Sequence, residues 1–149
     1  MLRTLVIGYG NPLRGDDGVG GCAAERLRVM VSDPAVEILS LHQLTPELME
    51  PISRAGRVIF IDACAGPNPG EIRERRVEPK ELQRAAFTHH PSPESLVAGA
   101  RTLYGRAGEA TLVTVVGADF SLSSDLSPVV RQRMDDVLAA VLRLSAADH

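Results

Sequence analysis

A glycine-rich segment from Gly8 to Gly20 places two adjacent carboxylates, Asp16 and Asp17, directly after a short apolar run. The apolar run before it and the amphipathic stretch after it are typical of a strand, a tight loop and the start of a helix. Glycines allow positive φ and close backbone contact, so such a loop can hold both carboxylates at the carboxyl end of the strand. Carboxylates in that place can bind a cation.

Three interpretations of this loop compete. A dinucleotide-binding fingerprint needs a third glycine where the chain has Leu13, and a phosphate-binding loop ends in Gly-Lys-Ser/Thr, where Asp16 and Asp17 would repel phosphate. In the third, Asp16 only caps the helix and Asp17 only favours its positive end, effects worth about 1 kcal/mol or less each. An Asp at the end of a later strand, Asp62, and a His89-His90 pair favour a functional interpretation.

Purely structural roles stay open for the other polar residues. Asp62 can cap the turn after its strand, and His89 and His90 can be solvated loop residues. His42 can be satisfied by a neighbouring carbonyl group.

Short β-branched runs alternate with longer amphipathic stretches along the chain, which is typical of βα units around a mostly parallel sheet. Strands are predicted at 2–7, 36–41, 58–61 (ending at Asp62), 71–77 and 111–116. Helices are predicted at 18–31, from Thr45 as the cap, at 92–104 and from Ser127 onward as one last helix. The 71–77 segment follows its predecessor too closely for a crossover helix, so we expect an antiparallel edge strand. The fold class is therefore α/β: a three-layer α/β/α sandwich around about five strands, mostly parallel and twisted, with one antiparallel edge strand.

Length and composition indicate one domain over residues 1–149, large enough to bury a core without disulfides. The net charge is −3 and no basic stripe with interleaved aromatic residues occurs, so nucleic acid is not expected as a partner. The first apolar run is too short for a signal peptide or a membrane span, which predicts no membrane insertion and a cytoplasmic protein. Cys22, expected on a buried helix face, and Cys64 are predicted to remain thiols.

The segment Gly8–Gly20 resembles the hallmark of the hydrogenase maturation protease family, a strand followed by Gly-x-Gly-Asn-x-Leu-x-x-Asp-Glu/Asp-Gly-x-Gly. Every fixed position of that pattern is met. The likeness continues through segments 41–48, 61–63 and 88–96, so it covers essentially the full length.

This resemblance implies an endopeptidase that removes the C-terminal extension of a nickel-iron hydrogenase large-subunit precursor after nickel insertion. The family's metal-contacting residues correspond by motif to Asp17, Asp62 and His89, with His90 as the alternative to His89. Position 17 holds Asp where some members carry the longer Glu, which changes the reach of the side chain. The precursor is then the partner and supplies the nickel, with zinc or cadmium as substitutes, and the protein is expected to be a monomer.

Two carboxylates and one imidazole suit a borderline divalent ion such as nickel or zinc, and three protein ligands leave positions open for substrate or water. Peptide hydrolysis needs an activated water, for which Asp17 or Asp62 can accept the proton. No Gly-x-Ser-x-Gly or His-Glu-x-x-His motif offers another protease mechanism. Two alternatives stay open: a non-catalytic α/β module that binds a small anion or nucleotide through the glycine loop, and a related protease with another substrate.

Overall fold

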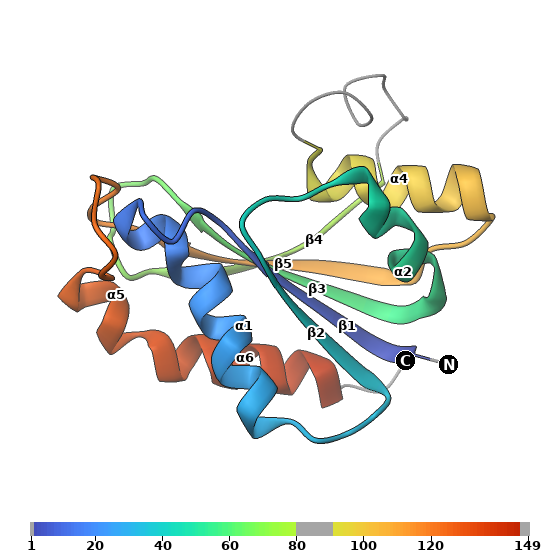
Figure 1. The fold of residues 1–149 in the computed structure, drawn as a ribbon, viewed down its shortest axis with the longest axis horizontal. Coiled ribbons are helices and arrows are strands. Elements are labelled where there is room, and N and C mark those ends of the chain that lie inside the picture. Colours follow the sequence, from blue (N-terminus) through green and yellow to red (C-terminus); the bar gives the residue numbers. More distant parts are fainter. Residues whose placement is uncertain (1, 80–90, 147–149) are drawn as a thin grey trace.

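A twisted five-stranded sheet forms the centre of the computed structural model, which describes residues 2–79 and 91–146 (Figure 1). The strand order is β2-β1-β3-β5-β4, and every neighbouring pair is parallel except β4 with β5. The strands are β1 (Leu2–Tyr9), β2 (Val36–Leu41), β3 (Ala55–Cys64), β4 (Ile72–Arg76) and β5 (Glu109–Val116). The predicted fold class, an α/β sheet with one antiparallel edge strand, is confirmed.

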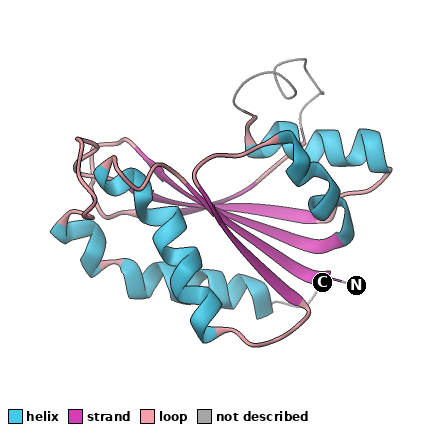
Figure 2. Ribbon diagram, in the orientation of Figure 1, coloured by secondary structure: helices cyan, strands magenta, loops and turns pink. Residues whose placement is uncertain are grey.

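Helices cover both faces of this sheet (Figure 2). One face packs against α1 and α6, and the other packs against α2 and α4. The described helices are α1 (Val19–Met30), α2 (Met49–Arg54), α4 (Pro93–Tyr104), α5 (Pro128–Gln132) and α6 (Met134–Ala146), with short 3₁₀ turns at η1 (Gly15–Gly18) and η2 (Pro46–Leu48). Among these described segments, no helix is long and apolar enough to cross a membrane.

Alternation along each central strand divides the core into two parts. In β3, Phe60 belongs to the cluster under α2 and α4, whereas Ile59 and Ile61 belong to the cluster under α1 and α6. All three side chains are fully buried, which explains why this stretch is apolar throughout instead of alternating with polar residues. Burial of each such side chain is worth about 1.5–3 kcal/mol.

Several element boundaries differ from the sequence-based expectation. β3 continues past Asp62 to Cys64 because its last residues pair with β5. Thr45 makes no side-chain cap, and a 3₁₀ turn precedes α2. The last helix is interrupted at Arg133, where φ is −92° and ψ is −2° and the backbone N–H donates to the Val130 carbonyl oxygen, three residues back, at 3.0 Å; the helix is therefore divided into α5 and α6.

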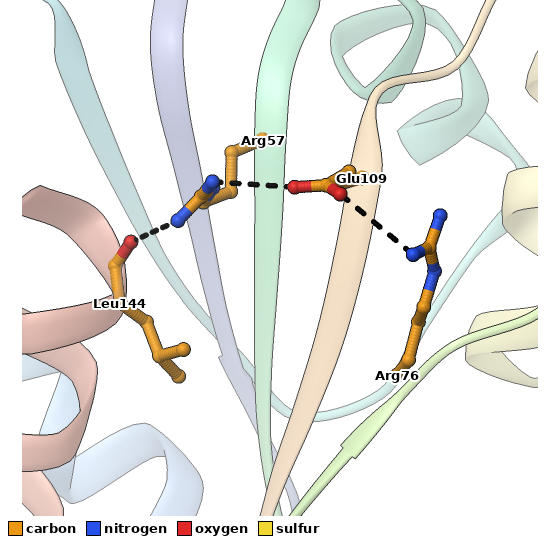
Figure 3. A network of polar contacts seen from close by, with 4 residues as sticks. All are labelled: Arg57, Arg76, Glu109 and Leu144. Carbon is orange, nitrogen blue, oxygen red and sulfur yellow. Dashed lines mark hydrogen bonds and ion pairs between the residues drawn. The ribbon is translucent and has the colours of Figure 1, made fainter. Parts of the chain in front are cut away.

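An ionic network joins the strands at the end of the sheet opposite the carboxyl ends of β1 and β3 (Figure 3). The Arg57 side chain is only 8% exposed; its Nη1 donates to the carbonyl oxygen of Leu144 at 2.5 Å and its Nη2 to Glu109 Oε2 at 3.2 Å. The other Glu109 oxygen lies 3.7 Å from Arg76 Nη1. The network thus ties β3, β4, β5 and the end of α6 together.

The order of the sheet reverses at β1, which has β2 on one side and β3 on the other. Loops that leave the carboxyl ends of β1 and β3 therefore diverge at this point. In open α/β sheets, the crevice formed by such a divergence is where ligands bind.

Candidate active site

Glycines in the loop after β1 and in the first turn of α1 allow close contacts between backbone segments. A Cβ on Gly20 would lie 2.3 Å from the Ile61 carbonyl oxygen and 2.6 Å from that of Tyr9. Gly10 has φ +145°, and a Cβ there would lie 1.9 Å from the Asp17 carbonyl oxygen. The glycines therefore bring α1 against β1 and β3 and fold the loop back on itself.

Asp16 is fully buried and binds a distant loop. Its carboxylate accepts hydrogen bonds from the backbone N–H groups of Ala118 (2.7 Å), Asp119 (3.0 Å) and Ser127 (2.7 Å), and from the Ser127 hydroxyl (2.8 Å). The interpretation in which Asp16 only caps the following helix is not supported, since neither η1 nor α1 has a side-chain cap. This carboxylate instead fixes the loop after β1 to the segment that follows β5.

Asp17 and Asp62 line one cavity of about 380 Å³, here called the carboxylate cavity. Asp17 comes from the loop after β1, and its Oδ2 accepts a hydrogen bond from the Asn11 backbone N–H at 2.7 Å. Asp62 lies near the end of β3, and its Oδ1 accepts one from the Ala63 N–H at 2.7 Å. The structure thus brings these two predicted site residues together at the switch point of the sheet.

Burial and like charge shape the electrostatics of the cavity. Burial, with the nearby Asp17 charge as a smaller cause, raises the pKa of Asp62 from 3.8 to about 6, although hydrogen bonds from Tyr9 and Ala63 act in the opposite direction. The pKa of the Tyr9 hydroxyl is raised as well, first by burial and then by the Asp62 charge. A cavity that holds two carboxylates in this way is complementary to a cation.

Tyr9 is a site residue that the sequence analysis missed. It lines the carboxylate cavity and makes a side-chain hydrogen bond with Asp62, in which the Tyr9 hydroxyl is the donor to the ionised carboxylate. The signal available in the sequence was the alternation of side chains between the two faces of a strand. Tyr9 shares a strand face with Leu5 and Ile7, and Asp62 shares one with Phe60, so the parallel pairing of β1 with β3 brings their side chains together.

The remaining walls come from the loop after β1, from the segment after β2 and from the start of α4. They consist of Gly10, His42, Gln43, Leu44, Pro91, Ser92 and Pro93. Ser92 fixes the start of α4 by a capping box with Ser95. His42 is exposed at the wall of the cavity.

His89 and His90 lie outside the described residues. Within residues 2–79 and 91–146, no group of three or more His, Cys, Asp or Glu side chains is placed to hold a metal ion. Both cysteines are free thiols, and Cys22 is partly buried on the face of α1 that packs against the core.

Comparison with solved structures shows similarity over nearly the whole chain. The hydrogenase maturating endopeptidase HybD from E. coli has 26% sequence identity and a TM-score of 0.77, with 97% of this chain and 94% of that chain covered. An endopeptidase from E. coli solved in solution has 26% identity and a TM-score of 0.76, covering 99% and 96%. The [NiFe] hydrogenase maturation protease HycI from Thermococcus kodakarensis has 24% identity and a TM-score of 0.78, covering 97% and 93%.

No protein-family model matches the sequence, and no curated protein matches it either. The similarity is therefore carried by the three-dimensional structure together with the motif at residues 8–20. The resemblance indicated by the sequence is confirmed: along nearly its whole length, the chain has the fold of the [NiFe] hydrogenase maturation proteases.

Proposed function

We propose that the protein is an endopeptidase that removes the C-terminal extension from the large-subunit precursor of a nickel-iron hydrogenase after nickel insertion. In this proposal, the nickel ion arrives as part of the precursor and is contacted by Asp17, Asp62 and His89. The enzyme acts in the cytoplasm on a folded, metal-loaded partner. The similarity to HybD supports the reaction class.

The observation that carries this proposal is the pair of carboxylates in the carboxylate cavity. Asp17 and Asp62 come from different strands, and their side chains line the same space of about 380 Å³. Their mutual repulsion contributes to the raised pKa of Asp62, and a divalent cation would relieve it. Carboxylate oxygens are suitable ligands for a borderline divalent ion such as nickel.

The same side chains can serve the chemistry of peptide hydrolysis. The oxygen of a water molecule adds to the scissile carbonyl carbon, the carbon–nitrogen bond breaks, and the departing nitrogen takes a proton. Asp17 and Asp62 offer carboxylates that can accept the proton of the attacking water. Tyr9, by its hydrogen bond, holds the Asp62 carboxylate in place. A bound metal ion supplies Lewis-acid polarisation in such reactions.

The anion- or nucleotide-binding alternative has no observation in its favour. The glycines at positions 10 and 20 are explained by backbone contacts within the protein. Asp16 is fully used by its four hydrogen bonds, and Asp17 places negative charge at the loop. A phosphate group would be repelled there.

Cleavage of nickel-loaded and nickel-free precursor by the purified protein tests the proposal. We expect the loaded precursor to lose its C-terminal extension, which mass spectrometry detects, and the nickel-free precursor to remain intact. Asp17→Asn and Asp62→Asn should each reduce cleavage by about 100-fold or more while circular dichroism stays unchanged. Equal processing of both precursors would contradict the recognition of nickel, and no processing of either would contradict the proposed activity.

A further inference from the structure

A second cavity, of about 270 Å³, adjoins the carboxylate cavity and has no role in the proposed chemistry. It lies between the start of α1, the end of β2 and the loop after β1, and is here called the glycine cavity. Gly10 and His42 line both cavities, so the two spaces are neighbours across a shared wall. A peptide bound at Asp17 and Asp62 therefore has the glycine cavity beside it.

The glycine cavity lies beside Gly21 of α1, where a Cβ would meet a side-chain oxygen and no backbone atom. A Cβ on Gly20 would collide with backbone atoms of Tyr9 and Ile61, but a Cβ on Gly21 would meet only Ser40 Oγ, at 3.2 Å. Glycine inside a helix is unfavourable relative to alanine. The absence of a side chain at Gly21, a residue that lines the cavity, keeps this space free.

The walls of the glycine cavity favour an apolar occupant. Carbon-rich side chains of Pro12, Leu41 and Leu126 line it, together with Cys22. Two of its polar side chains already have partners: Ser40 Oγ donates to the Gly21 carbonyl oxygen at 3.1 Å, and Glu25 is paired with Arg28. His42 and Ser124 are the other polar side chains in its lining. A cavity of roughly 150 Å³ is enough for benzene, so this one can hold any apolar side chain.

Exposed apolar side chains on the two adjacent loops indicate that the occupant belongs to a polypeptide. Leu13 is 58% exposed and Leu122 is 80% exposed. The Ser123 N–H donates to the Leu13 carbonyl oxygen at 3.0 Å, which holds the two loops together. The same loops contribute Pro12 and Ser124 to the cavity. Exposed apolar groups gathered around a concave site are typical of surfaces that bind another protein.

We propose that the glycine cavity is a substrate subsite, which binds an apolar side chain of the precursor close to the scissile bond. This inference rests on the proposed function, because it takes the carboxylate cavity as the place of cleavage. An extended peptide advances about 3.3 Å per residue, so a side chain a few residues from the scissile bond reaches the neighbouring cavity. Leu13 and Leu122 contact the precursor at the rim.

The variant Gly21→Leu, which fills the glycine cavity, tests the subsite. We expect the KM for nickel-loaded precursor to rise about tenfold or more with kcat nearly unchanged, as for the loss of an apolar contact made equally in ground and transition states. Ala139→Leu places the same side chain on an exposed face of α6 and should leave both constants unchanged. An unaltered KM in a folded Gly21→Leu variant would contradict the subsite.

A second measurement uses the unmodified chain and needs no cleavage. Cys22 lines the glycine cavity, so bound precursor should slow its alkylation by iodoacetamide at least fivefold, as followed by peptide mass spectrometry. Protection of Cys22 without cleavage would support the subsite while the proposed function fails. Cleavage with undiminished alkylation, or no binding of the precursor at all, would overturn the subsite.

Discussion

Adjacent carboxylates in the loop after β1 have different roles because their side chains point into different surroundings. Asp16 is fully buried, and its oxygens accept four hydrogen bonds from the segment after β5. Asp17 is only partly buried and lines the carboxylate cavity with a single backbone donor, Asn11. One residue is therefore needed for the fold, and the other is free to contact a ligand.

Asparagine at each of these two positions should separate the two roles. Asp16→Asn places an amide donor among groups that already donate, so we expect a loss of about 2–4 kcal/mol in the free energy of unfolding. Asp17→Asn keeps an oxygen for the Asn11 N–H and should change stability by less than about 1 kcal/mol while cleavage is lost. Urea denaturation and the precursor assay measure the two effects. A stable Asp16→Asn protein would show that its hydrogen bonds are dispensable.

The ionised Asp62 carboxylate lowers the free energy of unfolding, because it is buried. Because burial raises its pKa from 3.8 to about 6, the folded state favours the protonated acid. The contribution of protonated Asp62 to the free energy of unfolding is fully present below pH 3.8 and is lost as the pH rises through 6. Asp62→Asn, which removes the charge, should therefore stabilise the protein by about 2–3 kcal/mol at pH 8 and by less than about 1 kcal/mol at pH 4. Urea denaturation at both pH values is the measurement; an equal effect at both would contradict the role of charge.

At the scale of elements, the site depends on how closely α1 approaches the sheet. The start of α1 lies against the backbone of β1 and β3 through Gly20, and this contact sets where the loop with Asp17 stands relative to Asp62. Close approach of backbones requires a residue without a side chain. The position of Asp17 is thus determined by a residue three positions further along the chain.

Gly20→Ala should disrupt this approach. Its Cβ would meet three backbone atoms between 2.3 and 2.8 Å, none of which can move without displacing β1 or β3. We expect a loss of about 3 kcal/mol or more in the free energy of unfolding. Gly21→Ala, the neighbouring control, meets only a side-chain oxygen at 3.2 Å and should change stability by about 1 kcal/mol or less. Thermal unfolding of both variants tests the difference, and similar losses would contradict the backbone contact as its cause.

In the molecule as a whole, the two ends of the sheet along the strand direction have different roles. The carboxylate cavity lies at the carboxyl ends of β1 and β3, whereas the Arg57 network joins the strands at the opposite end of the sheet (Figure 3).

Glu109→Ala removes the carboxylate beside the buried Arg57 and should reduce the free energy of unfolding by about 1–2 kcal/mol, with kcat for the precursor unchanged. Glu78→Ala removes an exposed ion pair with Arg76 and should cost less than about 0.5 kcal/mol. A change in kcat for Glu109→Ala would show that the two ends are coupled.

Most of the fold was predictable because its signals are local. The apolar run at 58–61 indicated a strand buried on both faces, and the charged segment at 71–77 indicated an antiparallel edge strand; both are confirmed. The extension of β3 to Cys64 was not predictable, since pairing with β5 decides it. That pairing joins residues far apart in the sequence.

Patterns among neighbouring residues were enough for the α/β class, for the loop with its two carboxylates and for the resemblance carried by Gly8–Gly20, because strand patterns and glycine spacing are local signals. Contacts between distant segments were needed to show which carboxylate faces the cavity, that Tyr9 is the partner of Asp62, and that Asp16 belongs to the fold. The meeting of Tyr9 and Asp62 depends on strand order and register, and a shift of one residue would turn one of these side chains to the other face. The role of Asp16 depends on its hydrogen bonds to the segment after β5.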